Sequence, residues 1–368
     1  MGMRKATTAL LVSASYALSA CGSEPVLSDV PPSSTAPHST APSSAASSAA
    51  AADDAPETDK AAPEDIRAQA AAKLMPPALN YEDARAKLDV GVGGLFIPSW
   101  ADPELLSDGP RGINALREEI GRDFEVSIDF EGGRVQRFSE ILGEYPSPQA
   151  MAEGHSPEEV EAMATEIGHS LRAHGITVDF APVLDVDGGG LEVVGDRAFS
   201  TDPQAAGDYG AAFARGLQAA GVKAVFKHFP GHGRASGDTH LGEAVTPPLE
   251  ELYSHEFVPF HTALPKAPEA ALMMGHLVVP GLGEEPASLN PRAYQLAREE
   301  LGFEGTIYTD DLGGMASISE NFSVPEAVAA ALAAGADMPL WSTDEDIDAV
   351  IDAAAEVVAQ QESNRATD

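Results

Sequence analysis

Apolar runs and polar helical segments alternate along most of the chain, and the helical segments begin and end in similar ways. A polar capping residue followed by proline begins the predicted helices at Ser156-Pro157, Asp202-Pro203 and Asn290-Pro291, because proline suits the first helical position. Glycine ends these helices before short apolar runs, as Gly221 does before residues 222–226. The pattern predicts a repeated unit of one helix and one strand.

Seven short apolar runs are candidate strands of a parallel sheet, because helices separate strands in such folds. They are residues 94–97, 124–129, 177–186, 222–226, 270–274, 306–309 and 337–341. We expect an eighth strand, the first in the chain, near residues 73–77. Polar motifs follow several different strands, which favours an α/β fold of the (β/α)8 TIM-barrel type over a doubly wound open sheet with one binding crevice.

The N-terminus has the features of an export signal. Arg4 and Lys5 precede an apolar run that is too short to span a bilayer, and Leu18-Ser19-Ala20-Cys21 follows it. This ending resembles the bacterial lipobox, which implies cleavage before Cys21 and lipidation of that residue. Cys21 is the only cysteine, so no intramolecular disulfide is possible. We therefore interpret residues 1–20 as a signal peptide.

The composition after Cys21 predicts a disordered linker up to residue 70. Residues 31–52 are Pro, Ser, Thr or Ala except for His38, and such a tract cannot bury enough apolar surface to fold. We expect one folded domain over residues 71–362 and a tail over 363–368. The formal net charge of −36 argues against nucleic acid and anionic lipid as partners.

The candidate chemistry is concentrated between Lys227 and His240. This Gly-rich stretch carries His228, His232 and His240, and turn formation alone does not require three imidazoles. Asp238 lies two residues before His240, where its carboxylate can orient the ring and set its protonation. The alternative is that these histidines only satisfy backbone groups.

A zinc site is a second alternative for this stretch, because two histidines and an aspartate suit Zn²⁺. Pro230 and Gly231 separate His228 from His232, so the two imidazoles cannot share a helical face as in the H-E-x-x-H motif. We therefore expect no metal and no cofactor.

Five ordered motifs resemble family 3 glycoside hydrolases, in the branch of bacterial β-N-acetylglucosaminidases. The resemblance covers about residues 93–340. The motifs are Asp129-Phe130-Glu131-Gly132-Gly133-Arg134-Val135-Gln136-Arg137-Phe138, Asp179-Phe180-Ala181-Pro182-Val183-Leu184-Asp185-Val186, Gly195-Asp196-Arg197-Ala198-Phe199, Lys227-His228-Phe229-Pro230-Gly231-His232-Gly233 followed by Asp238-Thr239-His240, and Thr309-Asp310-Asp311-Leu312.

The resemblance implies a retaining mechanism with Asp310 as the nucleophile and His240, oriented by Asp238, as the acid/base. Asp311 is the rival nucleophile, but neighbours in a strand point to opposite faces, so only one of the two aspartates can face the pocket. The role of His276 stays open between pocket wall and core.

The substrate-binding residues implied by the resemblance are Asp129, as acceptor for sugar hydroxyls, and Arg197, Lys227 and His228, as donors around it. The expected substrates are β-linked N-acetylglucosamine glycosides, including muropeptides. The expected location is extracytoplasmic, with a lipid anchor as the only contact with the membrane. The alternatives are a phosphorylase or β-glucosidase of the same family, a metal-dependent hydrolase, and a sugar-binding lipoprotein without turnover.

Overall fold

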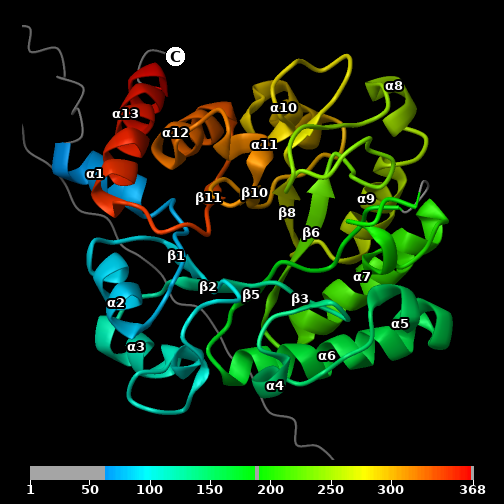
Figure 1. The fold of residues 1–368 in the computed structure, drawn as a ribbon, viewed down its shortest axis with the longest axis horizontal. Helices are drawn as coiled ribbons and strands as arrows, with labels where there is room; N and C mark the ends of the chain where they lie inside the picture. Colours follow the sequence, from blue (N-terminus) through cyan, green and yellow to red (C-terminus); the bar gives the residue numbers. More distant parts are fainter. Residues whose placement is uncertain (1–62, 187–189, 366–368) are drawn as a thin grey trace, which may run out of the picture. The chain divides into compact units, whose positions relative to one another are not determined.

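The computed structural model describes residues 63–186 and 190–365. The predicted signal peptide, Cys21 and most of the predicted linker lie outside these ranges. Seven parallel strands form one sheet in the order β1-β2-β5-β6-β8-β10-β11 (Figure 1). They are β1 (Gly94–Phe96), β2 (Glu125–Ile128), β5 (Val178–Asp179), β6 (Lys223–Phe229), β8 (Ala271–Met274), β10 (Ile307–Asp311) and β11 (Met338–Leu340).

The segment around Met75 joins the two edges of this sheet. Met75 forms a parallel bridge with Leu340 on β11, and Pro77 forms one with Phe96 on β1. The backbone amide of Met75 donates to Pro339 (3.1 Å), and that of Phe96 donates to Pro76 (2.9 Å). The predicted eighth strand is therefore present as isolated bridges, because Pro76 and Pro77 have no N–H for a regular ladder. The (β/α)8 barrel is confirmed, and the doubly wound sheet is excluded.

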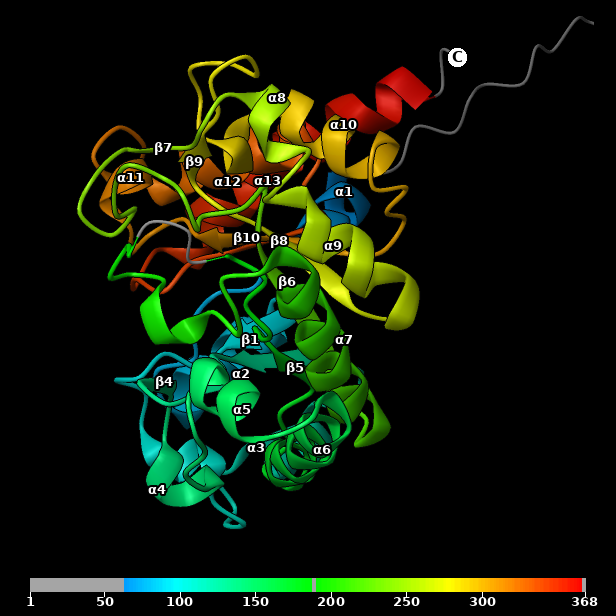
Figure 2. The same cartoon turned by 90° about the vertical axis from the view of Figure 1, so that its right-hand side faces the viewer.

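Helices surround the barrel and follow its strands (Figure 2). They are α1 (Pro63–Ala71), α2 (Tyr81–Asp89), α3 (Ile113–Ile120), α4 (Ser139–Leu142), α5 (Pro148–Gly154), α6 (Pro157–Ala173), α7 (Pro203–Ala219), α8 (Leu249–Leu252), α9 (Phe257–Ala263), α10 (Pro291–Glu299), α11 (Ala316–Ser319), α12 (Val324–Ala334) and α13 (Ile347–Arg365). Short pairs of strands lie outside the barrel: β3 (Phe130–Gly132) with β4 (Val135–Gln136), and β7 (Ala244–Val245) with β9 (Leu277–Val278). Within the described residues, no helix combines the length and the apolar character that a membrane span requires.

The predicted helix starts are confirmed by side-chain caps. Ser156 and Glu159 form a reciprocal capping box at the start of α6. The Asp202 carboxylate accepts from the amide of Ala205 (2.8 Å) at the start of α7, and the Asn290 side chain accepts from Arg292 (2.9 Å) at the start of α10.

The ends of the folded domain differ from the predicted boundaries. Helix α1 begins before residue 71 and packs against α13 (Figure 1). Arg67 on α1 donates to Asp348 on α13 (2.5 Å). Ala70 and Ala71 are fully buried there. Helix α13 runs to Arg365, which is beyond the predicted end at 362. Both helices therefore belong to the fold, because an alanine-rich helix gains its stability by packing on another element.

Aromatic and aliphatic side chains fill the barrel interior. The rings of Phe96 and Phe180 lie 5.9 Å apart, and those of Phe180 and Tyr308 lie 5.5 Å apart, so side chains from different strands meet across the barrel. Met273 and Leu340 belong to the same buried cluster. This packed interior forms the floor of the cavity at the carboxyl ends of the strands.

Two strand predictions need correction. The strand predicted over residues 177–186 is β5, with only Val178 and Asp179, since Pro182 has no N–H to continue the ladder. The strand predicted over 222–226 is β6, which continues to Phe229. Lys227 and His228 therefore lie on a strand, and the predicted loop begins after them.

Candidate active site

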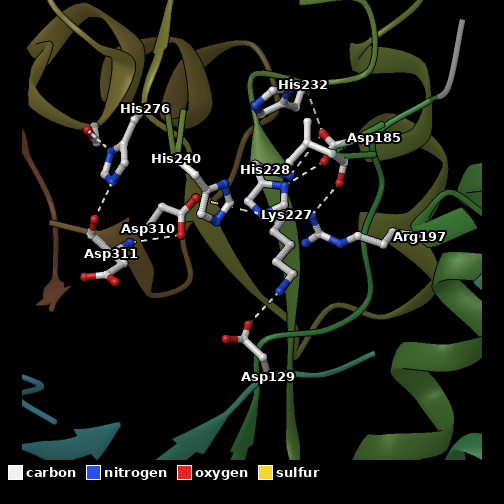
Figure 3. Close-up of polar contacts among 12 residues, drawn as sticks. Asp129, Asp185, Arg197, Lys227, His228, His232, His240, His276, Asp310 and Asp311 are labelled. Atoms are coloured by element: carbon white, nitrogen blue, oxygen red, sulfur yellow. Dashed lines mark hydrogen bonds and ion pairs between the residues drawn. The ribbon is translucent and has the colours of Figure 1, made fainter. Parts of the chain in front are cut away.

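Side chains from different strands converge on one cavity of about 370 Å³ (Figure 3). Asp129 follows β2, Lys227 and His228 end β6, and Asp310 lies near the end of β10. Because the strands are parallel, their carboxyl ends meet at one face of the barrel, where TIM barrels carry their active sites.

A buried ion network forms one side of this cavity. The Lys227 ammonium lies 2.8 Å from an Asp129 oxygen and 2.6 Å from a Glu131 oxygen. The Arg197 guanidinium donates twice to Glu131, at 2.8 and 2.7 Å. Burial raises the pKa of Glu131, but Arg197 and Lys227 outweigh it and hold that pKa well below the usual value. Glu131 therefore stays ionised and fixes both cations beside the cavity.

A carboxylate beneath His228 orients its ring. Asp185 lies 2.6 Å from Nδ1 of His228 and also accepts the backbone amide of His232 (2.7 Å). Burial raises the pKa of Asp185, but His228 and these hydrogen bonds lower it below the usual value. The ionised Asp185 makes Nδ1 of His228 the donor, so Nε2 faces Asp310, whose oxygen is 3.9 Å away.

His240 and Asp238 lie together on the loop after β6. The Asp238 carboxylate is 2.8 Å from Nδ1 of His240 and accepts the backbone amide of the same residue at 2.9 Å. The His240 side chain is 53% exposed, which places it at the open side of the cavity. Burial raises the pKa of Asp238, but the hydrogen bonds from His240 lower it overall. The carboxylate is thus ionised and leaves Nε2 of His240 available to a ligand.

The base of this loop is held tightly. A side chain at Gly233 would place its Cβ 1.8 Å from the carbonyl oxygen of Val186, so only glycine fits there. Arg234 donates twice to the buried Glu256, at 2.6 and 2.8 Å. The backbone amide of Ser317, in α11, donates to the carbonyl oxygen of Thr239 (3.1 Å). The loop that carries His240 is therefore connected to the segment that follows Asp310.

Asp310 and Asp311 have different environments. One oxygen of Asp311 accepts the amides of Gly313, Gly314 and Ser342 at 3.0, 3.0 and 2.9 Å, and the other accepts the Ser342 hydroxyl. Asp310 accepts only the amide of Asp311 (2.9 Å) among the hydrogen bonds of the described residues. Asp311 thus organises its own loop, and Asp310 has acceptor capacity left for a ligand.

The charge of Asp310 is set by its neighbours. Burial raises the pKa of Asp310, but His228, His276 and Lys227 outweigh it, so the pKa lies below the usual value. His276 itself is buried and bridges the Ser288 hydroxyl (2.7 Å) and the Asp311 carbonyl (2.9 Å). The structure therefore places His276 in the core beneath the loop, outside the residues that line the cavity.

Most of the predicted site residues line this one cavity. They are Asp129, Arg197, Lys227, His228, His240 and Asp310, and Asp238 contacts His240. Arg197 is bound to Glu131, and Asp129 is bound by Lys227 alone among the described residues. The described residues contain no group of three or more His, Cys, Asp and Glu side chains that could hold a metal ion.

Further residues of this site were not predicted from the sequence. Asp185 orients His228, and its position directly after a strand motif was the available signal. Arg137 also lines the cavity, with no side-chain hydrogen bond among the described residues. It lies within the motif that begins at Asp129 and ends at Phe138, and its charge there could have pointed to it. Glu131, noted in the sequence without a role, is the centre of the ion network.

The comparisons with known proteins agree with this geometry. Residues 68–367 match the family model described as the glycosyl hydrolase family 3 N terminal domain. The chain belongs to glycoside hydrolase family 3. The beta-hexosaminidase LpqI of Mycobacterium tuberculosis is a relative in this family, 43% identical over 299 residues, which are 78% of this chain and 75% of LpqI.

Solved structures of family 3 members have the same fold. A glycosyl hydrolase of this family from Mycobacterium smegmatis aligns with a TM-score of 0.74 and 40% identity, over 81% of this chain and 96% of that structure. A β-N-acetylglucosaminidase from a Paenibacillus species aligns with a TM-score of 0.72 and 31% identity, over 81% of this chain and 58% of that structure. The predicted family and barrel are therefore confirmed.

Proposed function

We propose that this family 3 enzyme is a retaining exo-β-N-acetylglucosaminidase that removes terminal N-acetylglucosamine from cell-wall-derived or related β-glycosides. The observation that carries the proposal is the shared cavity, in which the ionised Asp310 and the His240 and Asp238 pair occur together. The relatives named beta-hexosaminidase support the sugar.

Asp310 is the nucleophile in this proposal. Its carboxylate attacks the anomeric carbon as the bond to the leaving oxygen breaks, and an ester to the sugar forms. The support is its lowered pKa and free acceptor capacity, whereas Asp311 already accepts several loop hydrogen bonds. These hydrogen bonds leave Asp311 less acceptor capacity for a sugar than Asp310 has.

His240 is the acid/base. In the first step Nε2 gives its proton to the leaving oxygen, and in the second it takes a proton from the water that attacks the ester. Water then releases the sugar with its configuration retained and frees Asp310. Asp238 accepts from Nδ1, so it keeps the proton-transfer nitrogen directed away from itself and stabilises the imidazolium.

The sugar hydroxyls are held opposite Asp310. Asp129 accepts from them, and Arg197, Lys227 and His228 donate to them. Their mutual ion pairs support this role, because Glu131 and Asp129 already hold the cations in place before a ligand arrives. Such preorganisation reduces the entropy cost of binding.

The enzyme acts outside the cytoplasm as a membrane-anchored lipoprotein. The support is the N-terminal sequence, in which the export signal ends at Cys21 and the predicted linker follows. Two signals are needed for stable anchoring by lipid, and the diacylated cysteine of a lipoprotein supplies them.

The proposed activity is tested by comparing the hydrolysis rates of an aryl β-N-acetylglucosaminide and an aryl β-glucoside. Each rate is measured with and without phosphate. We expect faster turnover of the acetamido sugar, with free N-acetylglucosamine as the product in both buffers. A faster rate on the glucoside would indicate a β-glucosidase. A sugar phosphate as the product would indicate a phosphorylase, and no hydrolysis of any aryl β-hexosaminide would indicate a binding lipoprotein.

A further inference from the structure

Trp100 is an exposed aromatic side chain at the rim of the active-site cavity. It is 63% exposed, whereas Trp341, the other tryptophan of the chain, is 1% exposed. Among the exposed large apolar side chains of the described residues, Trp100 alone lines this cavity. An exposed indole beside a polar cavity leaves an aromatic face free to stack on a bound ligand.

The backbone holds Trp100 in a fixed position. Ile97, at the end of the preceding strand, donates to Ser127 on β2 (2.9 Å), and Ala101 donates to Pro98 (3.0 Å). The amide of Asp102 donates to Leu79 (2.8 Å). Ile97 and Ala101 are buried on either side of the exposed indole. The backbone of Trp100 is therefore fixed, and only the two side-chain torsions of the indole remain to be ordered when a ligand stacks on it.

The cavity has room for one sugar among its charged groups. Its volume of about 370 Å³ is near the lower end of the range for ligand sites, about 300–1,000 Å³. Lys227, His228 and Asp310 are buried, so the sugar that is cleaved off lies deep. The leaving group must then extend to the exposed side, where His240 and Trp100 lie.

We propose that Trp100 is the platform for the saccharide on the leaving-group side. This inference rests on the proposed function, because it needs a glycoside whose first sugar occupies the deep cavity. The indole face packs on the apolar C–H face of the second pyranose ring. Trp100 thus selects carbohydrate leaving groups over small ones and does not contact the sugar that forms the ester.

The test compares N,N′-diacetylchitobiose with N-acetylglucosaminyl β-fluoride, whose leaving group has no ring to stack. Trp100→Ala should lower kcat/KM for the disaccharide about tenfold, as truncation of a binding tryptophan typically does, and leave that for the fluoride within about twofold. Trp100→Phe should retain most of the disaccharide rate. Tyr253→Ala, an exposed aromatic outside the cavity lining, should change neither rate.

Fluorescence provides a second readout, because Trp100→Phe leaves Trp341 as the only indole. Acrylamide should quench Trp100 in the unmodified protein, and saturating disaccharide should protect it. This protection should be absent in Trp100→Phe. The platform is refuted if Trp100→Ala slows both substrates equally, or if the disaccharide gives no protection while it is turned over.

If the proposed function is wrong, the same experiment gives a different result. In that case the unmodified enzyme would turn over neither substrate, whatever the variants do. Protection of Trp100 by the disaccharide in such a protein would still support the platform, and its absence would overturn the platform as well.

Discussion

Replacing Glu131 by glutamine should destabilise the protein strongly, because this carboxylate lies between two buried cations. Its side chain is 0% exposed, and those of Arg197 and Lys227 are 12% and 2% exposed. In this variant Lys227 keeps Asp129 as a charged partner. Arg197 loses the Glu131 carboxylate, whose two oxygens accept from its guanidinium. Breaking a buried ion pair costs about 3–5 kcal/mol, so we expect a loss of that size in the free energy of unfolding.

Urea unfolding at pH 7 measures this loss, and Glu161→Gln is the matched control. Glu161 pairs with Arg215 at 3.0 Å, but both side chains are 36% exposed. Solvent screens such a pair, and its removal should cost less than about 1 kcal/mol. If Glu131→Gln costs no more than Glu161→Gln, the buried network does not stabilise the fold as argued.

The pH dependence gives a further check. Burial opposes ionisation of Glu131, but the two cations lower its pKa below the unfolded value, so its stabilisation is complete above the unfolded pKa of about 4.3. The difference between the unmodified protein and Glu131→Gln should stay constant from about pH 7 to 5 and shrink below about 4.3. A difference that shrinks already near pH 6 would contradict this reasoning.

The other predictions concern the reaction, a buried imidazole and the anchor. Asp310→Asn should lower turnover by several orders of magnitude, whereas Asp311→Asn should still form the covalent intermediate; peptide mapping after labelling with a fluorosugar checks this, and a label on Asp311 would reverse the assignment. His240→Ala should cut kcat/KM on a natural disaccharide by about 10² to 10⁴ and cost much less in glycosylation with a nitrophenyl leaving group, which departs without a proton. Equal losses on both substrates, in a protein of unchanged stability, would argue against the acid/base role. Burial lowers the pKa of His276, so its ring takes up a proton when the protein unfolds below the unfolded pKa of about 6.5. The free energy of unfolding should therefore decrease as pH falls below that value. His276→Gln should flatten the pH dependence of urea unfolding in this range, and an unchanged slope would show that other groups cause it. Cys21→Ser should release the protein from the membrane fraction with the activity of the folded domain intact, and equal retention would contradict lipid anchoring.

The order of helices and strands could be predicted from the sequence because caps, prolines and glycines are local signals. The end of β6 could not, since Pro230 and Gly231 made the whole motif resemble a loop. Lys227 and His228 are part of the strand because Lys227 bridges Val183 and Phe229 pairs with Met274 on β8. Pairing with neighbouring strands thus sets the end of β6, and local sequence propensity does not predict such pairing.

Strand alternation predicted that only one of Asp310 and Asp311 faces the pocket, but both line the cavity. The two differ instead in their hydrogen bonds, which hold Asp311 to its own loop. The role of Glu131 was not predictable, because its partners Arg197 and Lys227 are far away in the sequence. The same holds for Asp185 and His228, which meet only when their strands pair. Ion pairs between residues that are far apart in the sequence can be identified only once the fold is known.

Closure of the barrel by Met75 and Leu340 makes folding a process that involves the whole domain. The first element, α1, has α13 as its packing partner, and Arg67 and Asp348 are 281 positions apart in the chain. Contacts of such long sequence separation form slowly, because the intervening chain must lose its freedom first. A nascent chain that ends before β11 leaves the edge of β10 and the segment around Met75 unpaired and open to association with other chains. The segment around Met75, the first in the barrel, is therefore protected only after β11 has been synthesised and has paired with it.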